Sequence, residues 1–176
     1  MSKIFPNLRT ERLLLRQFIP KDIEQVFEGL SNPEVVKYYG VSYHSLSETE
    51  DQMKWFKSLE AEGTGMWWAI NALDDHQFYG ALGFNNLSTA HRKAELGFWL
   101  LPSYWGKGIM REAINGVCEY GFEKIKLHRI EAMVESENEN SKRSLENTGF
   151  NHEGQMQDCE IKNGKFISLD VYAKLH

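Results

Sequence analysis

The sequence has few cysteines and no long hydrophobic run. Its two cysteines, Cys118 and Cys159, lie too far apart for a Cys-x-x-Cys pair, so neither a disulfide framework nor a thiolate metal site is expected. We therefore expect two free thiols and a cytoplasmic location. No apolar run approaches the roughly 18 residues that a membrane helix needs. Arg9, Glu11 and Arg12 interrupt the N-terminal segment, which does not resemble a signal peptide.

Basic charge is also scarce. The chain has 20 Lys and Arg residues against 25 Asp and Glu residues, which gives a net charge of −5. Because nucleic-acid surfaces need clustered Lys and Arg, this balance argues against a nucleic-acid partner and weakly favours cationic ones. The six histidines have no spacing typical of metal ligands, so we expect no metal.

What is present suits one globular domain. With 176 residues and 41% hydrophobic content, the chain is long enough for one sizeable core and too short for two. It has no internal repeat, low-complexity tract or linker. We expect a single domain over residues 1–176.

The first third is expected to contain a strand and then helices. An apolar run predicts a strand over 10–18, and apolar residues at helical spacing predict a helix over 19–30. Asn32 is expected to open a short helix. Ser47 and Glu50, three residues apart, predict a capping box at the start of a third helix.

The middle of the chain predicts a sheet with one parallel pairing. Short polar connections separate apolar segments at 66–73, 78–87 and 93–102, which predicts antiparallel neighbours. A long amphipathic helix over 110–125, followed by a strand at 128–135, predicts a parallel crossover.

The last third predicts a short helix and a hairpin. Asn138 can cap that helix, and Gly149 can end it. Asn163-Gly164 is a strong turn signal between two final strands. The sum is an α+β fold whose mixed, mostly antiparallel sheet has about seven strands, with about four or five helices.

A glycine stretch, "YWGKGIMREA", joins the strand at 93–102 to the long helix. A loop of this kind presents free N–H groups and the positive end of a helix dipole, which suit a phosphate, and Lys107 adds positive charge. Gly106 and Gly108 are equally explained by a tight turn without a ligand. The dinucleotide fingerprint would need a third glycine where Arg111 stands, and no P-loop spacing occurs.

These motifs together resemble the GNAT superfamily of N-acetyltransferases, in particular its RimJ/RimL-type branch. The resemblance rests on "LRTERLLLRQF", "NPEVVKYY", "AELGFWLLPSYWGKGIMREA" and "NENSKRSLENTGF", and it spans nearly the whole chain. It implies a three-layer α/β/α fold, acetyl-CoA as co-substrate, an amine acceptor and no metal. It leaves a homodimer open.

The resemblance also implies a coenzyme site. The family's pyrophosphate loop, Gln/Arg-x-x-Gly-x-Gly/Ala, falls on Trp105, Gly106, Lys107, Gly108, Ile109 and Met110, where Trp105 and Met110 depart from the pattern. Main-chain groups around Phe98, Leu100 and Leu101 would hold the pantetheine arm like an added strand, with one N–H near the thioester oxygen. The same three residues are equally compatible with a plain core strand.

Two catalytic roles remain to be filled. Leu145 occupies the place of the family's usual tyrosine acid, and Ser141, in Asn138-x-x-Ser141, matches a serine that can donate to the thiolate. The alternative is a helix cap followed by an ordinary serine, and Asn138 could serve both purposes. Glu95, in mid-strand on the face of Gly97 and Trp99, is the candidate general base, acting directly or through water.

The other candidates have simpler explanations. Glu95 could instead belong to a solvated or ion-paired face. Glu160 could stand near the acceptor amine, but it is better explained as an exposed strand residue. Cys118 falls on the apolar stripe of the long helix and is expected to be a core thiol. Three tryptophans are expected in the core: Trp67, Trp68 and Trp99.

We predict an acetyl-CoA-dependent N-acetyltransferase in which the amine attacks the thioester directly within a ternary complex. The expected acceptor is a protein N-terminal amine, followed by a polyamine or another small amine. Two other classes stay open. One is a coenzyme-binding module without chemistry, which Leu145 makes conceivable. The other is a nucleotide-binding oxidoreductase fragment, against which the missing third glycine counts.

Overall fold

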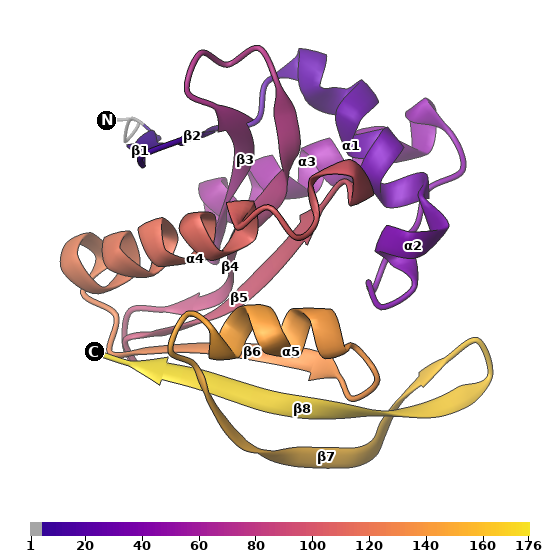
Figure 1. Cartoon of the computed structure of the whole chain (residues 1–176), viewed down its shortest axis with the longest axis vertical. Coiled ribbons are helices and arrows are strands. Elements are labelled where there is room, and N and C mark those ends of the chain that lie inside the picture. The colour runs from indigo at the N-terminus through magenta and orange to yellow at the C-terminus, as the bar shows by residue number, and fades with distance from the viewer. Residues whose placement is uncertain (1–4) are drawn as a thin grey trace.

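One eight-stranded sheet runs through the molecule (Figure 1). The computed structural model describes residues 5–176. The strands are β1 (Leu8–Arg9), β2 (Leu13–Arg16), β3 (Met66–Ala72), β4 (Phe78–Ser88), β5 (Lys93–Leu100), β6 (Arg129–Glu135), β7 (Asn151–Lys162) and β8 (Lys165–Leu175). The helices are α1 (Ile23–Ser31), α2 (Pro33–Val36), α3 (Leu46–Glu62), α4 (Ile109–Tyr120) and α5 (Glu139–Glu146).

The strand order is β1-β2-β3-β4-β5-β6-β8-β7, and β5 with β6 is the parallel pair among otherwise antiparallel neighbours. The predicted switch to parallel pairing is confirmed. The predicted strand over residues 10–18 is present as the shorter β2. Thr10 N–H donates to Leu13 O at 3.0 Å and turns the chain back, so an unpredicted strand, β1, precedes β2 and the total is eight.

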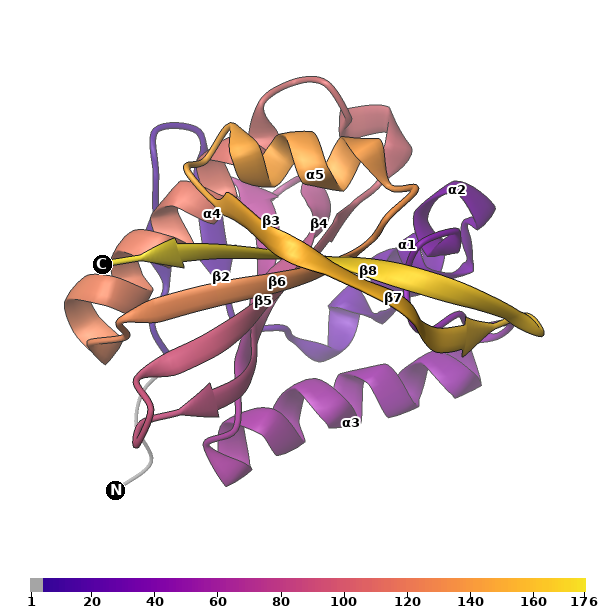
Figure 2. The same ribbon diagram turned by 90° about the horizontal axis from the view of Figure 1, so that it is seen from below.

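Helices cover both faces of the sheet and give the expected three layers. Figure 2 shows α4 and α5 on one face and α1 and α3 on the other. A large apolar cluster fills the space under α4 and α5, and a second one, which includes Trp67 and Trp99, fills the space under α1 to α3. Cys118 is buried in the first cluster, where burial raises the pKa of its thiol to about 12, so the prediction of a core thiol is confirmed.

Two of the three predicted helix caps are confirmed. The side chain of Asn32 accepts a hydrogen bond from Glu34 N at the start of α2, and Asn138 caps α5. The capping box at Ser47 and Glu50 is wrong, because α3 already begins at Leu46. Its cap is the preceding Ser-x-x-Glu pair: Ser45 Oγ accepts from Glu48 N at 3.2 Å, and His44 N donates to Glu48 Oε2 at 2.8 Å. The sequence holds this pattern twice in overlapping register, and only tertiary packing selects between the copies.

The long helix and the final hairpin are confirmed, with one difference. The last turn of the long helix, Gly121–Ile125, is a π-helix rather than a continuation of α4. Asn163 and Gly164 both have positive φ, as a two-residue hairpin turn requires. No helix within residues 5–176 is both long enough and apolar enough to span a lipid bilayer.

Candidate active site

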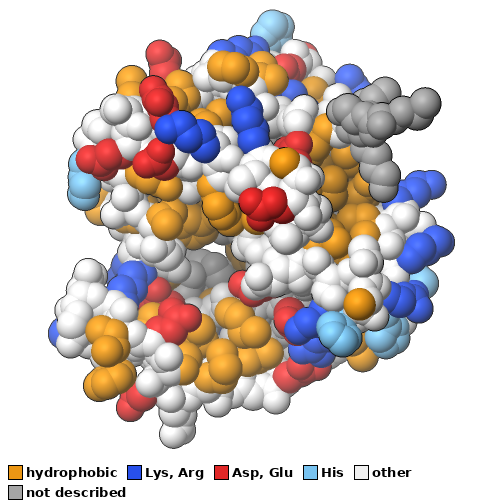
Figure 3. Space-filling model, turned by 180° about the vertical axis from the view of Figure 1, so that it is seen from behind, with side chains coloured by type: hydrophobic (Ala, Val, Ile, Leu, Met, Phe, Trp, Pro, Cys, Tyr) orange, Lys and Arg blue, Asp and Glu red, His pale blue; other side chains and the backbone are white. Residues whose placement is uncertain are grey.

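The central feature of the sheet is a split between β5 and β6. The two strands pair over three positions, Lys93 to Glu95 against Arg129 to Glu131. Beyond this point β5 runs on to Leu100 and β6 to Glu135 without pairing to each other. Figure 3 shows the surface hollowed on the side where α2 faces the tip of the β7–β8 hairpin in Figure 1. The split therefore opens to solvent between two strand ends.

Main-chain groups of β5 face this split. Leu101 N–H donates to Tyr79 O at 2.9 Å, so the odd-numbered residues of β5 direct their main chain toward β4. Phe98 and Leu100 then direct theirs toward the split, because the direction alternates along a strand. The carbonyl of Leu100 already accepts from Trp105 Nε1 at 2.9 Å. The N–H of Leu100 and both main-chain groups of Phe98 are therefore the groups that face the split. Both main-chain groups of Leu101, in contrast, form hydrogen bonds within the protein.

The loop from Trp105 to Met110 leads from this strand into α4. Gly106 and Gly108 have φ of 72° and 75°, a region that favours glycine, and Gly108 is the N-cap of α4 with no side chain capping the helix. The first-turn N–H groups of α4 are therefore available to an anion. Lys107 Nζ lies 5.3 Å from the centre of the Tyr104 ring. The loop has the features of an anion site, although the turn itself already explains both glycines.

Glu95 lies at the last paired position before the split. The register places it beside Glu131 on the face of α1 and α3, and Asn86 Nδ2 donates to Glu95 Oε2 at 2.9 Å. Glu131 is ion-paired with Lys93 at 3.0 Å and Arg129 at 2.7 Å. Burial alone would raise the pKa of Glu131, but these two partners outweigh it and lower the pKa. Within residues 5–176 no Lys or Arg forms an ion pair with Glu95, in contrast to Glu131.

Asn138 and Ser141 form a connected pair at the start of α5. Asn138 Oδ1 accepts from Ser141 N at 3.2 Å, and Asn138 Nδ2 donates to Ser141 Oγ at 2.9 Å. Because Ser141 Oγ accepts this bond, its own hydrogen can be donated elsewhere. Leu145 is fully buried in the core beneath α5. Glu95 and Ser141 thus belong to opposite sides of the sheet, since Glu95 lies on the face of α1 and α3 and Ser141 belongs to α5 on the other face.

The sequence did not indicate a third set of residues at the mouth of the hollow. Lys162 Nζ donates to Lys37 O at 2.6 Å and to Glu135 Oε1 at 2.5 Å, and so joins the hairpin tip to the end of α2 and to β6. Lys162 and Lys37 are 125 positions apart, so no local pattern could reveal the contact. Glu160 is exposed on β7, close to the same tip.

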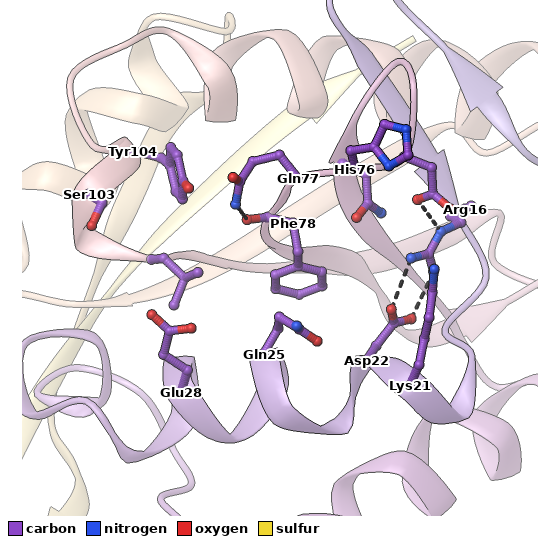
Figure 4. Close-up of a pocket in the computed structure, with 13 residues that line it drawn as sticks. Arg16, Lys21, Asp22, Gln25, Glu28, His76, Gln77, Phe78, Ser103 and Tyr104 are labelled. Atoms are coloured by element: carbon purple, nitrogen blue, oxygen red, sulfur yellow. Dashed lines mark hydrogen bonds and ion pairs between the residues drawn. The ribbon is translucent and has the colours of Figure 1, made fainter.

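Two cavities lie outside the split, and the first of them reaches Leu101, which directly follows β5. One, of about 280 Å³, lies between α1, the β3–β4 turn and Tyr104 (Figure 4). Arg16 lines it and is held by Asp22 at 2.7 Å and Asp75 at 2.6 Å, a paired cluster that fastens α1 to the sheet. The other, of about 440 Å³, lies between β1 and α4. Across residues 5–176 no group of three His, Cys, Asp or Glu side chains is arranged to hold a metal.

Comparison with known proteins agrees with this geometry. A family model described as "Acetyltransferase (GNAT) domain" matches residues 12–151. The chain is 37% identical over 171 residues to "Uncharacterized N-acetyltransferase YoaA" from Bacillus subtilis, with 97% of each chain covered. It is 33% identical over 170 residues to "Uncharacterized N-acetyltransferase p20" from Bacillus licheniformis, with 96% of each chain covered. A crystal structure of a GNAT-family acetyltransferase from Bacillus anthracis superimposes with a TM-score of 0.86 at 28% identity, covering 97% of this chain and 98% of that one.

Proposed function

Because the chain belongs to the GNAT acetyltransferase family and is an acetyl-CoA-dependent N-acetyltransferase, we propose that it acetylates protein N-terminal amines in the split between β5 and β6. The strand β5, which leads into the loop before α4, and the strand β6, which leads into α5, stop pairing beyond Glu95 and Glu131. Acetyl-CoA supplies an activated acyl group as a thioester. The protein has to bind it, deprotonate the amine and protonate the leaving sulfur.

The residues present fit the coenzyme. In our proposal the main chain of Phe98 and Leu100 binds the pantetheine arm, and one of their N–H groups stabilises negative charge on the thioester oxygen. The N–H groups from Gly106 to Met110 bind the pyrophosphate, with Lys107 adding charge. Leu101 and Trp105 act indirectly, since Leu101 anchors the strand to Tyr79 and Trp105 holds the carbonyl of Leu100.

Two side chains carry the proton transfers in this proposal. Glu95 accepts a proton from the amine, directly or through water, as the new C–N bond forms. Ser141 donates its hydroxyl proton to the sulfur as the C–S bond breaks, and it regains a proton from solvent. Asn138 supports Ser141, since its Nδ2 donates to the hydroxyl oxygen at 2.9 Å. No covalent enzyme intermediate is needed.

The pairing of the acidic side chains favours a protein N-terminus over a polyamine. A polyamine carries several positive charges and needs several free carboxylates. Three glutamates belong to β5 and β6. Lys93 and Arg129 neutralise Glu131, and Lys162 neutralises Glu135, so within residues 5–176 Glu95 is the one of the three without a cationic partner. This observation carries the proposal for the acceptor.

Relatives exist on both sides of this choice. The chain is 25% identical over 101 residues to "Ribosomal-protein-serine acetyltransferase" from Escherichia coli and 28% identical over 92 residues to "Spermidine N(1)-acetyltransferase" from the same species. Each match covers little more than half of this chain, at 57% and 52%. The polyamine therefore stays the second candidate.

The test measures thiol release from acetyl-CoA with matched acceptors. A lysine-free peptide with a free N-terminal serine, the same peptide with its N-terminus blocked, and spermidine are compared at equal concentration. We expect release with the free peptide at a kcat/KM at least about tenfold above that for spermidine, a difference of about 1.4 kcal/mol, and none with the blocked peptide. A higher kcat/KM for spermidine would replace the protein acceptor by a polyamine. Coenzyme binding without turnover on any amine would leave a binding module.

Domain organisation, location and oligomeric state concern the chain as a whole. We propose that residues 1–176 form one domain, since β1 near the start and β8 near the end belong to one sheet. Two free cysteines support a cytoplasmic location. Exposed Ile161 and Phe166 at the hairpin tip leave a homodimer open, which sedimentation velocity would decide.

A further inference from the structure

Arg12 lies at the turn between β1 and β2 and contacts the start of α4. Its Nε donates to Glu112 Oε2 at 2.6 Å, and its main-chain N–H donates to Glu112 Oε1 at 2.8 Å. Arg12 Nη1 also donates to the carbonyl oxygen of Lys107 at 3.2 Å, and Thr10 Oγ1 donates to Glu112 Oε1 at 2.5 Å. The turn is therefore fastened both to the first turn of α4 and to the loop before it.

Glu112 is an acidic residue in the first turn of α4, close to the proposed anion site. Burial tends to raise the pKa of Glu112, but the hydrogen bonds from Thr10 and Arg12 outweigh burial and lower the pKa. Glu112 is therefore ionised at neutral pH. A carboxylate in the first turn of a helix interacts favourably with the helix dipole, but it repels a pyrophosphate bound at the same end. The guanidinium of Arg12 offsets this repulsion at close range.

The contact with Lys107 also sets a peptide direction. In a trans peptide the carbonyl of Lys107 and the N–H of Gly108 point in opposite directions. Because Arg12 holds that carbonyl, the N–H of Gly108 is directed to the other side of the loop. Arg12 Nη2 lies 3.5 Å from the position that a Cβ on Gly108 would occupy, so the guanidinium lies directly beside the N-cap of α4.

We propose that Arg12 is a positioning residue for the coenzyme: it aims the N–H of Gly108 at the pyrophosphate and cancels the charge of Glu112 beside it. The inference rests on the proposed function, because it needs the loop to bind the pyrophosphate. It adds to the site a residue from the turn between β1 and β2, 100 positions before Glu112 in the sequence. The role is indirect, through Lys107 and Glu112.

The test is the dissociation constant of acetyl-CoA, measured by isothermal titration at low salt. We expect R12Q to raise this dissociation constant by about tenfold, because the variant loses one positive charge close to a phosphate. R12K should lie between R12Q and the wild type, because Lys keeps the charge and loses the planar fork. The matched control is R9Q. Arg9 is exposed on the same hairpin and donates to Leu73 O at 3.4 Å. The R9Q variant should bind acetyl-CoA as tightly as the wild type does.

A second pair of measurements separates positioning from damage to the fold. R12Q/E112Q should recover part of the affinity that R12Q loses, and the difference between R12Q and the wild type should shrink as salt is raised. The KM of the amine should stay unchanged. Affinity of R12Q within twofold of R9Q would overturn the inference. A loss of affinity in R12Q that does not change with salt concentration, and that becomes larger in R12Q/E112Q, would also overturn the inference. If the wild type itself fails to bind acetyl-CoA, the proposed function falls first.

Discussion

Glu95 and Glu131 lie side by side at the last paired position of β5 and β6, and of the two it is Glu131 that is ion-paired. Lys93 and Arg129 hold Glu131 in its charged form. Glu95 instead accepts a hydrogen bond from the neutral side chain of Asn86. The same strand register thus produces one carboxylate held by two cations and one held by a neutral amide.

Replacing Glu95 tests its role as general base. E95Q should lower kcat by about 10²- to 10⁴-fold, the usual contribution of a positioned base, and leave the KM for acetyl-CoA within about twofold. The measurement is steady-state thiol release at saturating peptide. E50Q, on the exposed side of α3, is the control and should retain wild-type kcat. Unchanged kcat in E95Q would remove Glu95 from the mechanism.

Ser141 can be tested against a neighbour on the same helix. S141A should lower kcat by about a hundredfold at most, since water can replace the missing proton donor in part. S144A is the control, because Ser144 is half-buried on the same helix and its Oγ donates to Asn140 O at 2.9 Å. The rate of S141A should also fall less with an acyl donor whose thiolate leaves more easily. Equal rates for the two variants would reduce Ser141 to a helix-capping role.

The sequence could predict what depends on local pattern. The positive φ of Gly106 and Gly108, the cap at Asn138 and the hairpin turn at Asn163 follow from short-range rules. The choice between Ser45 and Ser47 as the cap of α3 could not be predicted, because both positions fit the same pattern and burial of the helix decides.

Contacts between segments that are distant in the sequence could not be predicted from it. Glu95 is one of several strand carboxylates in the sequence, and only the structure shows that Glu131, its neighbour in the register, has cationic partners while Glu95 has a neutral one. Arg12 lies in a segment that predicts only a strand, and its contact with Lys107 depends on how β2 packs against α4. The candidate site was therefore predictable as a set of motifs and not as a charge distribution.

Lys162 should affect acceptor choice. K162M leaves Glu135 without its partner and so adds a free carboxylate to the hollow. We expect the KM for spermidine to fall by about fivefold, on the order of one new partly screened charge pair, with the KM for acetyl-CoA unchanged. K165M, an exposed change on the same hairpin, is the control. If K162M and K165M have equal spermidine KM values, Lys162 does not control the acceptor.

The ion pairs of Asp170 should make the free energy of unfolding fall as the pH becomes acidic. Burial tends to raise the pKa of Asp170, but hydrogen bonds from Lys142, His152 and Gln155 outweigh it and lower the pKa. The folded pKa therefore lies below the unfolded value of about 3.9. The stabilisation is complete above that value and is lost as pH falls through the folded pKa.

Urea unfolding of the wild type and D170N, at pH 7 and at a series of values below 4, measures this effect. The stability gap between them should be largest at pH 7 and should narrow as Asp170 becomes protonated. D51N is the control: Asp51 is exposed on α3 with a surface ion pair to Lys54, and this variant should stay within about 0.5 kcal/mol of the wild type at pH 7. A gap between wild type and D170N that stays the same at every pH would show that the ion pairs of Asp170 add nothing.

Amide hydrogen exchange of the wild-type protein with and without acetyl-CoA is the most direct test of the coenzyme site. Binding should slow exchange at Phe98 and Leu100, which face the split, and from Gly106 to Met110 in the loop before α4. Arg16, Asp22 and Asp75, which line the cavity of Figure 4 at its end away from Ser103 and Tyr104, should show no change. Protection of these three residues, or of neither set, would contradict a coenzyme site between β5 and β6.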